Sequence, residues 1–565
     1  MSKKGKQVAV LLVIAVVVFG VIYGVVALTR NVGRNPSQVS EEKALQTLDK
    51  LYAKLSVNTP TPRKGYISVE GTNPQDELPE ITKYPPVVEA STTLYAEIFS
   101  SPEKAGSGTD GWLAEVAAAF NLSGATVNGK PVSIRLRSIS SGLAVDYIST
   151  GKYVPDAITP SNELWGEMLT AKGVSIELIE KRMAGNVAGV LFTKEKQKLL
   201  IEKYGAVDTK SIAQAVRAGE LTMGYTNPLV SSTGLNYLLS TLVAIDPKDP
   251  LSDAATAAFE EFSANVPFVA YNTLQMRQAA FGGVLDGMVM EYQLYANMPE
   301  IQTEYTFTPF GTRHDSPLYA VGKISDEKKE IIKLFNEFCK DEKWNKLATN
   351  YGFNQNLNYS SDVLDGLDGK TIIKAQSLWK EKKNGGQPIT AVFVADISGS
   401  MNGEPLNKLK ESLVNGANYI GRDNYIGLVT FSDSSNVNIA LPIGKFDVNQ
   451  HAYLVGAVED MQAGGNTAMY DAITVGAKML VDAKEKNPNT KLLMFVLTDG
   501  ERNMGLYYED VKTMLQGLKI PIYTIGYRAN IDVLQQISSL NEAASINADD
   551  QDVVYQLGNL FNAKM

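Results

Sequence analysis

The stretch that decides the fold is AVFVADISGSM, residues 391–401. A run of apolar residues ends at Asp396, and Ser398 and Ser400 follow at alternate positions. An uninterrupted apolar run of this length is typical of a central parallel strand buried on both faces. In an open α/β sheet, ligands bind beyond the carboxyl ends of the strands, where we expect these three polar side chains. Taken alone, the pattern is equally consistent with a turn, because Asp and Ser are common turn and N-cap residues.

Two residues far along the chain favour a metal site over a turn. Thr467 lies in the glycine-rich loop AGGNTAMYDAI, which opens a predicted helix, and Asp499 ends the apolar strand KLLMFVLTDG. Together with Asp396, Ser398 and Ser400 they offer two carboxylates and three hydroxyls, and oxygen is the ligand that Mg²⁺ prefers. Such a set is an incomplete coordination shell. We therefore expect one position on the metal to be open to another molecule.

These motifs resemble the von Willebrand factor A (VWA) domain and its metal-ion-dependent adhesion site, in the segments DISGSM, GGNTAMYDAI and VLTDGE. The resemblance covers about 390–565 and implies a Rossmann-like sheet. It also implies that a divalent cation, Mg²⁺, Mn²⁺ or Ca²⁺, is bound at this site. The residues that would hold it directly or through water are Asp396, Ser398, Ser400 and Thr467, and Asp499 would usually act through water. In the family, the open position commonly accepts a carboxylate from a protein partner. Asp471 is better explained as a first-turn helix acid than as part of the site.

Composition excludes several functional classes. The chain has 565 residues and a net charge of −9, which argues against a nucleic-acid binder. One cysteine and two histidines rule out an internal disulfide and disfavour zinc or histidine-dependent catalysis. The nucleotide-binding pattern GxxxxGK[ST] is absent from the sequence. Metal-assisted hydrolysis at Asp471 and Asp499 is disfavoured because no base is identifiable, so we expect a non-enzyme.

The N-terminus predicts a membrane anchor. Val8–Leu28 is a run of 21 uncharged, mostly apolar residues, about 32 Å long as a helix. We expect a transmembrane signal anchor over 8–29 and a cytoplasmic tail over 1–7, because three lysines precede the span. The bulk of the chain would then be extracellular or periplasmic. A cleaved signal peptide is the alternative, but its apolar region is usually shorter.

Residues 30–89 predict a juxtamembrane helix followed by a proline-rich linker. SEEKALQTLDKLYAKL places apolar residues on one helical face, with Ser40 as the predicted N-cap. The helix is either a stalk or a helix docked on a neighbouring domain. The following segment, 57–88, contains six prolines, a density that indicates an extended linker.

Residues 90–355 alternate strands and helices, which predicts a second α/β unit, joined by a connector over 356–389. Three loops, in FSSPEKAG, SISSGLAVDYI and TNPLVSSTGLNYLL, put hydroxyl residues at predicted helix starts. Free N–H groups there favour a polar or anionic ligand, although each loop is also explained by ordinary N-capping. The candidate ligand-binding residues, to which Glu291 in GGVLDGMVMEYQL is added, are Ser100, Ser101, Ser140, Ser141, Ser231, Ser232, Thr233 and Glu291.

This middle unit resembles a type 2 periplasmic solute-binding protein, the class that feeds ABC transporters. The segments that carry the resemblance are SSGLAVDYISTGKYVPDAITPSNELW, GYTNPLVSSTGLNYLLSTL and GGVLDGMVMEYQL. The resemblance implies two lobes with the ligand in the cleft between them, and chain crossings near 186–193 and 315–322. The unit would hold a small polar or anionic solute, or act as a scaffold.

The leading functional hypothesis is a membrane-anchored adhesion or binding protein that engages a protein partner through the metal. The alternative is a solute-binding accessory subunit of an ABC-type transport or envelope complex, docked by its VWA domain.

Overall fold

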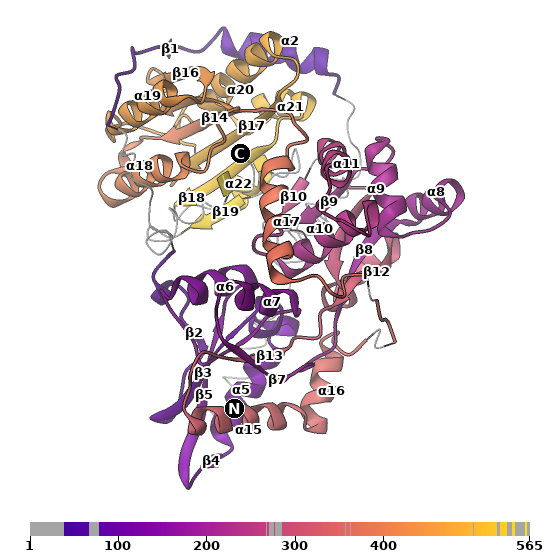
Figure 1. The fold of residues 1–565 in the computed structure, drawn as a ribbon. Helices are drawn as coiled ribbons and strands as arrows, with labels where there is room; N and C mark the ends of the chain where they lie inside the picture. The colour runs from indigo at the N-terminus through magenta and orange to yellow at the C-terminus, as the bar shows by residue number, and fades with distance from the viewer. Residues whose placement is uncertain are drawn as a thin grey trace, which may run out of the picture.

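The computed structural model describes residues 39–66, 78–266, 268–270, 276, 285–355, 358–361, 363–500, 502–527, 531–538, 545–548, 560–561 and 565. Within them the chain forms three β-sheets, each covered by helices (Figure 1). Two sheets belong to the middle of the chain and the third to the C-terminal unit. The α/β architecture predicted for both units is confirmed.

The C-terminal unit is built on a seven-stranded sheet in the order β1-β16-β15-β14-β17-β18-β19. β14, which carries AVFVAD, is central and pairs in parallel with β15 and β17. Every residue of β14 is buried, as predicted for a central parallel strand. The carboxyl ends of the three parallel strands therefore meet at one edge. The strands of this sheet are β1 (Val57–Asn58), β14 (Ile389–Asp396), β15 (Tyr425–Phe431), β16 (Val437–Lys445), β17 (Lys491–Thr498), β18 (Ile522–Tyr527) and β19 (Ser545–Ala548).

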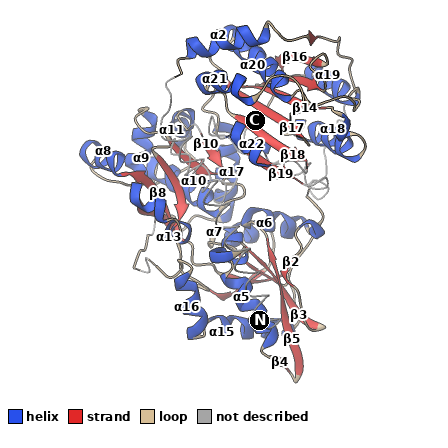
Figure 2. Ribbon diagram, turned by 180° about the vertical axis from the view of Figure 1, so that it is seen from behind, coloured by secondary structure: helices blue, strands red, loops and turns tan. Residues whose placement is uncertain are grey.

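Helices cover both faces of this sheet (Figure 2). Alternate residues of a strand point to opposite faces, so Phe393 of β14 enters one core while Val392 and Val394 enter the other. α18 and α19 close the first core, and α20, α21 and α22 close the second. The helical segments are η3 (Gly399–Met401), α18 (Glu404–Ala417), α19 (Val448–Glu459), α20 (Met469–Lys486), α21 (Tyr508–Leu518) and α22 (Ile531–Ser538).

The first of the described helices, α2 (Glu41–Tyr52), packs on the C-terminal unit, against α20 and α21 (Figure 1). Ser40 caps it as predicted, accepting the N–H of Lys43 at 3.3 Å. Its residues Leu48 and Leu51 are buried in the same core as β14. Of the two alternatives drawn from the sequence, a stalk or a docked helix, the structure shows the docked helix. Its partner is distant in sequence.

The segment that follows α2 also belongs to the C-terminal unit. β1 (Val57–Asn58) pairs in parallel with β16 at the sheet edge. Arg63 then forms ion pairs of 2.8 Å with Glu459 and with Asp460. The N–H of Gly65 donates to the carbonyl of Ala452 at 2.8 Å. Part of the segment predicted as a linker is thus a structural element of the C-terminal unit, and the middle unit is inserted between the two parts.

The first lobe of the middle unit has a sheet in the order β2-β5-β3-β6-β13-β7, with β4 paired to β5. Its helices α5 and α15 pack on the sheet around Trp112 and Phe335. The strands are β2 (Pro86–Val88), β3 (Leu94–Ser100), β4 (Thr126–Val127), β5 (Lys130–Ser138), β6 (Ala157–Thr159), β7 (Ile176–Glu180) and β13 (Leu318–Val321). The helices are η1 (Ile81–Lys83), α4 (Pro102–Ala105), η2 (Gly108–Asp110), α5 (Trp112–Leu122), α6 (Ser141–Thr150), α7 (Leu164–Ala171), α15 (Asp326–Cys339) and α16 (Glu342–Asn350).

The second lobe has a five-stranded sheet in the order β10-β9-β11-β8-β12. The chain crosses into it between β7 and β8 and returns between β12 and β13, close to both predicted crossings. The strands are β8 (Val187–Thr193), β9 (Met223–Thr226), β10 (Phe268–Ala270), β11 (Gly287–Glu291) and β12 (Tyr305–Arg313). The helices are α8 (Lys194–Tyr204), α9 (Thr209–Arg217), α10 (Ser232–Ile245), α11 (Asp253–Ala264), α13 (Tyr292–Ala296) and α14 (Pro299–Glu304).

The connector contains α17 (Gly369–Lys382), which lies between the C-terminal unit and the middle unit (Figure 1). It contacts α7 of the first lobe and α10 and α11 of the second. Trp379 of α17 is fully buried in the core that both lobes share. The connector is therefore packed on the middle unit rather than extended.

The predicted transmembrane span over 8–29 lies outside the described residues. Among the helices that the structure describes, none is long and apolar enough to cross a membrane.

Candidate functional site

Three loops at the carboxyl edge of the C-terminal sheet carry the predicted metal ligands. Asp396 is the last residue of β14, and Ser398 and Ser400 follow it. Asp499 comes directly after β17, the neighbour of β14. Thr467 lies just before α20.

Four of the five predicted residues form one hydrogen-bonded cluster. The Ser400 hydroxyl donates to Oδ1 of Asp499 at 2.8 Å, and its Oγ lies 3.1 Å from that of Ser398. The backbone N–H of Ser398 donates to Oδ1 of Asp396 at 2.8 Å. Oδ2 of Asp396 accepts the hydroxyl of Thr498 at 2.5 Å. The carboxylates of two neighbouring strands are therefore linked through the two serines.

The loop of Thr467 is tied to the same edge through its backbone. The Thr467 N–H donates to Oδ1 of Asn503 at 2.8 Å, and the Asn503 N–H donates back to the Thr467 carbonyl at 3.2 Å. The N–H of Gly399, between the two serines, donates to the Gly465 carbonyl at 3.0 Å. All three loops are thus bonded to one another, which holds the five predicted residues in one place.

Asp396 is an ionisable group in a buried position. It is 0% exposed, and Ser398 and Thr467 are also buried, whereas Ser400 is exposed. Burial, together with the nearby carboxylate of Asp499, raises the pKa of Asp396 to about 6, against the lowering effect of the Thr498 and Ser398 hydrogen bonds. A carboxylate in this position gains most from a cation at the exposed side.

The donor set fits a hard divalent cation, because every side chain in it presents oxygen. Among the described residues, no three His, Cys, Asp or Glu side chains lie together in a group that could hold a metal. The cluster here has a different composition, since it combines two carboxylates with hydroxyls. Its residues are therefore the ones to consider for a cation.

Residues that the sequence analysis missed hold these loops. Asp433, after β15, accepts the backbone N–H of Asn466 at 3.1 Å and its side-chain amide at 2.7 Å. Asp471, predicted as a helix acid, does lie in the first turn of α20, and it accepts the N–H of Leu506 at 2.7 Å. Thr498 and Asn503 stand within or beside quoted motifs, but only the fold shows that they face the site.

The predicted solute-binding residues gather where the two lobes of the middle unit meet. The Ser232 hydroxyl, at the start of α10, donates to the Ser141 hydroxyl of α6 at 3.2 Å and accepts the indole N–H of Trp165 at 2.8 Å. The Gly142 N–H donates to the carbonyl of Val230 at 3.2 Å. The lobes are therefore hydrogen-bonded to each other directly.

Of the remaining predicted hydroxyls, those of Ser231 and Ser100 have local partners. Ser231 is the N-cap of α10, and its hydroxyl accepts from that of Thr226 at 2.9 Å. Ser100 donates to the carbonyl of Ser101 at 3.3 Å. Ser140 is the N-cap of α6 but makes no side-chain capping bond. Of these three residues only Ser231, which also accepts the N–H of Gly234, supports the N-cap interpretation, because Ser100 ends β3 and Ser140 makes no capping bond.

A buried lysine occupies the first-lobe side of this junction. Lys104 is 0% exposed, and its Nζ donates to the Thr159 carbonyl at 3.1 Å and to the Ser101 hydroxyl, and lies 3.4 Å from Oε1 of Glu103. Burial lowers the pKa of Lys104, and Glu103 and Glu291 oppose that change. Burial alone would raise the pKa of Glu103, but Lys104 and the Ser101 and Ser161 hydroxyls bring it below the usual value.

Glu291 is the centre of a second buried group. Its Oε1 lies 2.8 Å from Nδ1 of His314 and accepts the Thr233 hydroxyl at 3.2 Å, and its Oε2 accepts the Asn186 amide at 3.0 Å. We call Glu103, Lys104, Glu291 and His314 the interlobe ion cluster. Sequence analysis identified Ser101, Thr233 and Glu291 but not Lys104, Glu103 or His314.

Residues 391–562 match the von Willebrand factor type A domain family, so the chain carries a VWA domain. The inter-alpha-trypsin inhibitor heavy chain H3 of Bos taurus is 28% identical over 155 residues, which are 26% of this chain and 17% of that protein. The chain thus spans less than a fifth of the length of this relative.

The solved structures to which the chain is similar include a von Willebrand factor type A structure and a sulfate-binding protein. The von Willebrand factor type A protein from Catenulispora acidiphila has a TM-score of 0.29 and 18% identity, and the match covers 31% of this chain and 42% of that one. The sulfate-binding protein SubI from Mycobacterium tuberculosis has a TM-score of 0.34 and 15% identity, over 48% of this chain and 91% of that one.

Proposed function

We propose that this chain is a non-enzymatic, membrane-anchored protein that binds a protein partner through a divalent cation on its VWA domain. The observation that carries the proposal is the hydrogen-bonded cluster of Asp396, Ser398, Ser400 and Asp499 at one sheet edge. These residues and Thr467 would hold Mg²⁺, or Mn²⁺ or Ca²⁺, with Asp499 acting through water. A carboxylate of the partner would complete the coordination shell.

The anchor is residues 8–29, with residues 1–7 in the cytoplasm and the bulk of the chain extracellular or periplasmic. This part of the proposal rests on the apolar sequence alone. Since α2 begins at Glu41 and packs on the VWA domain, residues 30–40 separate the proposed span from that domain. Eleven residues reach at most about 40 Å, so the metal-binding domain would stay close to the membrane surface.

The test is a pull-down with the full-length protein on the cell lysate, in Mg²⁺ and in EDTA. We expect a partner that is retained by the wild type in Mg²⁺ and lost in EDTA and with Asp396→Ala. The matched control is Asp482→Ala, an acid on the solvent side of α20 that pairs with Lys478. A partner retained equally by Asp396→Ala in Mg²⁺ would contradict the proposal.

A second candidate function is a solute-binding accessory subunit of an ABC-type transport or envelope complex, in which the VWA domain serves for docking. One observation favours it: two buried amide oxygens at the lobe junction, Oδ1 of Asn162 and Oε1 of Gln293, have no hydrogen-bond partner within the described structure. Buried acceptors of this kind are usually satisfied, so a bound polar molecule would account for them. Native mass spectrometry of the protein purified without denaturation tests this. A mass equal to the apoprotein in every preparation favours the scaffold role instead.

A further inference from the structure

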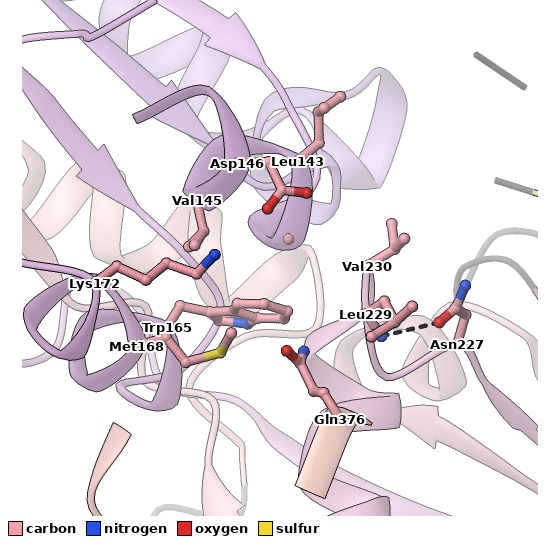
Figure 3. Close-up of a pocket in the computed structure, with 11 residues that line it drawn as sticks. Leu143, Val145, Asp146, Trp165, Met168, Lys172, Asn227, Leu229, Val230 and Gln376 are labelled. Atoms are coloured by element: carbon pink, nitrogen blue, oxygen red, sulfur yellow. Dashed lines mark hydrogen bonds between the residues drawn. The ribbon is translucent and has the colours of Figure 1, made fainter. Parts of the chain in front are cut away.

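A cavity of about 140 Å³ lies where both lobes meet the connector helix α17. Figure 3 shows its wall: Asp146 of α6, Trp165 and Met168 of α7, Lys172 at the end of α7, Leu229 of the second lobe and Gln376 of α17. We call it the α6–α7 pocket. It has the volume of a cavity that holds benzene, roughly 150 Å³, so it suits a molecule of about six to eight non-hydrogen atoms.

The α6–α7 pocket borders the lobe junction described above, because Gly142, Trp165 and Val230 belong to both. None of the residues of the interlobe ion cluster lines it. The direct contact between the lobes at Gly142 and Val230 forms part of its wall. Gln376 belongs to the connector, outside the two lobes, and its amide donates to the carbonyl of Pro228 at 2.7 Å. A molecule in this pocket therefore touches both lobes and the helix that leads to the VWA domain.

Asp146 supplies the negative charge of the pocket. Its side chain is only partly exposed and makes no hydrogen bond or ion pair with another residue in the part of the chain that the structure describes. Burial raises the pKa of Asp146 to about 6, and Lys172 partly opposes this. A carboxylate that is partly removed from water without a bonded partner favours a ligand that brings a hydrogen-bonding cation.

Lys172 supplies the positive charge at the mouth of the pocket. It is exposed, lies more than 4.0 Å from the Asp146 carboxylate, and points toward the same space in Figure 3. A ligand with a positive charge alone would be repelled by Lys172, and one with a negative charge alone would be repelled by Asp146. Only a molecule with both charges pairs with both residues.

The remaining wall combines the polar side chains of Asn227 and Gln376 with an apolar part. Trp165 is buried and its indole N–H is already used by Ser232, so the ring offers only its apolar surface. Met168 and Leu229 extend this surface. A short alkyl body between the two charged ends fits these side chains, and a ring face beside an ammonium group adds a favourable contact.

We propose that the α6–α7 pocket binds a small zwitterion of amino-acid size, with its ammonium group at Asp146 and its carboxylate at Lys172. The carbon body of the ligand lies on Trp165 and Met168. Because the pocket includes Gln376, the bound molecule ties α17 to both lobes.

The test is isothermal titration calorimetry on the full-length protein with glycine, L-alanine, β-alanine and glycine betaine. Isopropylamine and propionate are the matched probes, since each keeps one charge of L-alanine. The variants are Asp146→Asn and Lys172→Met, with Lys198→Met on the exposed face of α8 as the control. Lys172 is exposed, so its variant is expected to fold even where Asp146→Asn does not.

We expect saturable one-to-one binding of at least one zwitterion, weakened about tenfold or more by Asp146→Asn and by Lys172→Met and unchanged by Lys198→Met. The single-charge probes bind about tenfold more weakly or not at all. The proposal is overturned if no zwitterion binds up to about 20 mM, if binding survives both variants, or if isopropylamine or propionate binds as well as the zwitterions.

Discussion

Asp396 at the VWA sheet edge and Glu103 at the lobe junction are both buried carboxylates among hydroxyl groups, and their pKa values shift in opposite directions. Burial and Asp499 raise that of Asp396 to about 6. The lysine beside Glu103 lowers that of Glu103 although burial opposes it. The difference is the cation: Lys104 is part of the chain, whereas the group that would balance Asp396 has to come from outside. The lobe junction is thus electrostatically completed by its own residues, whereas the VWA edge would be completed by the divalent cation proposed above.

The largest effect is expected from removing the built-in cation. Lys104→Met leaves Glu103 and Glu291 buried beside an apolar side chain, and breaking a buried pair in this way costs about 3–5 kcal/mol. Urea unfolding of the full-length protein measures it, with Lys198→Met as the surface control. A loss below about 1 kcal/mol would mean that the lobe junction does not depend on Lys104.

Leu48→Ala tests which parts of the chain make up the VWA domain. Leu48 of α2 is fully buried in the core that contains β14, so we expect a loss of about 2–4 kcal/mol in the unfolding transition of that domain. Leu122→Ala is the control, because Leu122 is 88% exposed on the first lobe. An unchanged VWA transition would show that α2 only rests on the surface.

The opposite pKa shifts predict opposite pH dependences in EDTA. The unfolded chain binds fewer protons at Asp396 than the folded one between about pH 4 and 6, so this residue costs stability once ionised. Asp396→Asn should therefore stabilise the metal-free protein by up to about 3 kcal/mol at pH 7.5, an advantage that disappears as the pH falls toward about 4.

Glu103→Gln should change the pH dependence of stability in the opposite direction to Asp396→Asn. The lowered pKa of Glu103 contributes stability that is present above its unfolded value and lost as the pH falls. The variant should be less stable than the wild type at pH 7.5, and the gap should narrow below about pH 4. Guanidinium unfolding across this pH range checks both variants. If the stability of Asp396→Asn and of Glu103→Gln, each relative to the wild type, changed with pH in the same direction, the opposite pKa shifts of the two carboxylates would be contradicted.

The positions of the polar residues at the VWA sheet edge were predictable, because these residues stand at the ends of apolar strands. Asp396 and Asp499 each close an apolar run, and carboxyl ends of parallel strands meet at one edge. The helix α2 itself was predictable, because its apolar face and its Ser40 cap are visible in the local sequence. The domain on which it packs was not predictable, because the residues it contacts are far away in the chain. Asn58 donates to Asn438, which is 380 residues away, and no local pattern indicates such a pairing.

The sequence predicted where the polar residues of the lobe junction lie, but not that a buried lysine is among them. Ser101, Thr233 and Glu291 do lie there, because helix N-termini follow strand ends. Lys104 stands inside the quoted segment FSSPEKAG, yet a lysine in such a segment is almost always on the surface. Its burial depends on Thr159, Glu103 and Glu291, which come from three different elements. A pattern of hydroxyl residues at helix starts therefore does not indicate that the chain itself supplies the cation.

The most direct test of the account is the thermal unfolding of the full-length protein as Mg²⁺ is added, for the wild type, Asp396→Ala and Asp482→Ala. A ligand that binds only the folded domain adds about 2.7 kcal/mol at a hundred times its Kd. We expect the VWA transition of the wild type and of Asp482→Ala to move to higher temperature, and that of Asp396→Ala to stay where it is. A wild-type transition unmoved by Mg²⁺, Mn²⁺ and Ca²⁺ alike would contradict it.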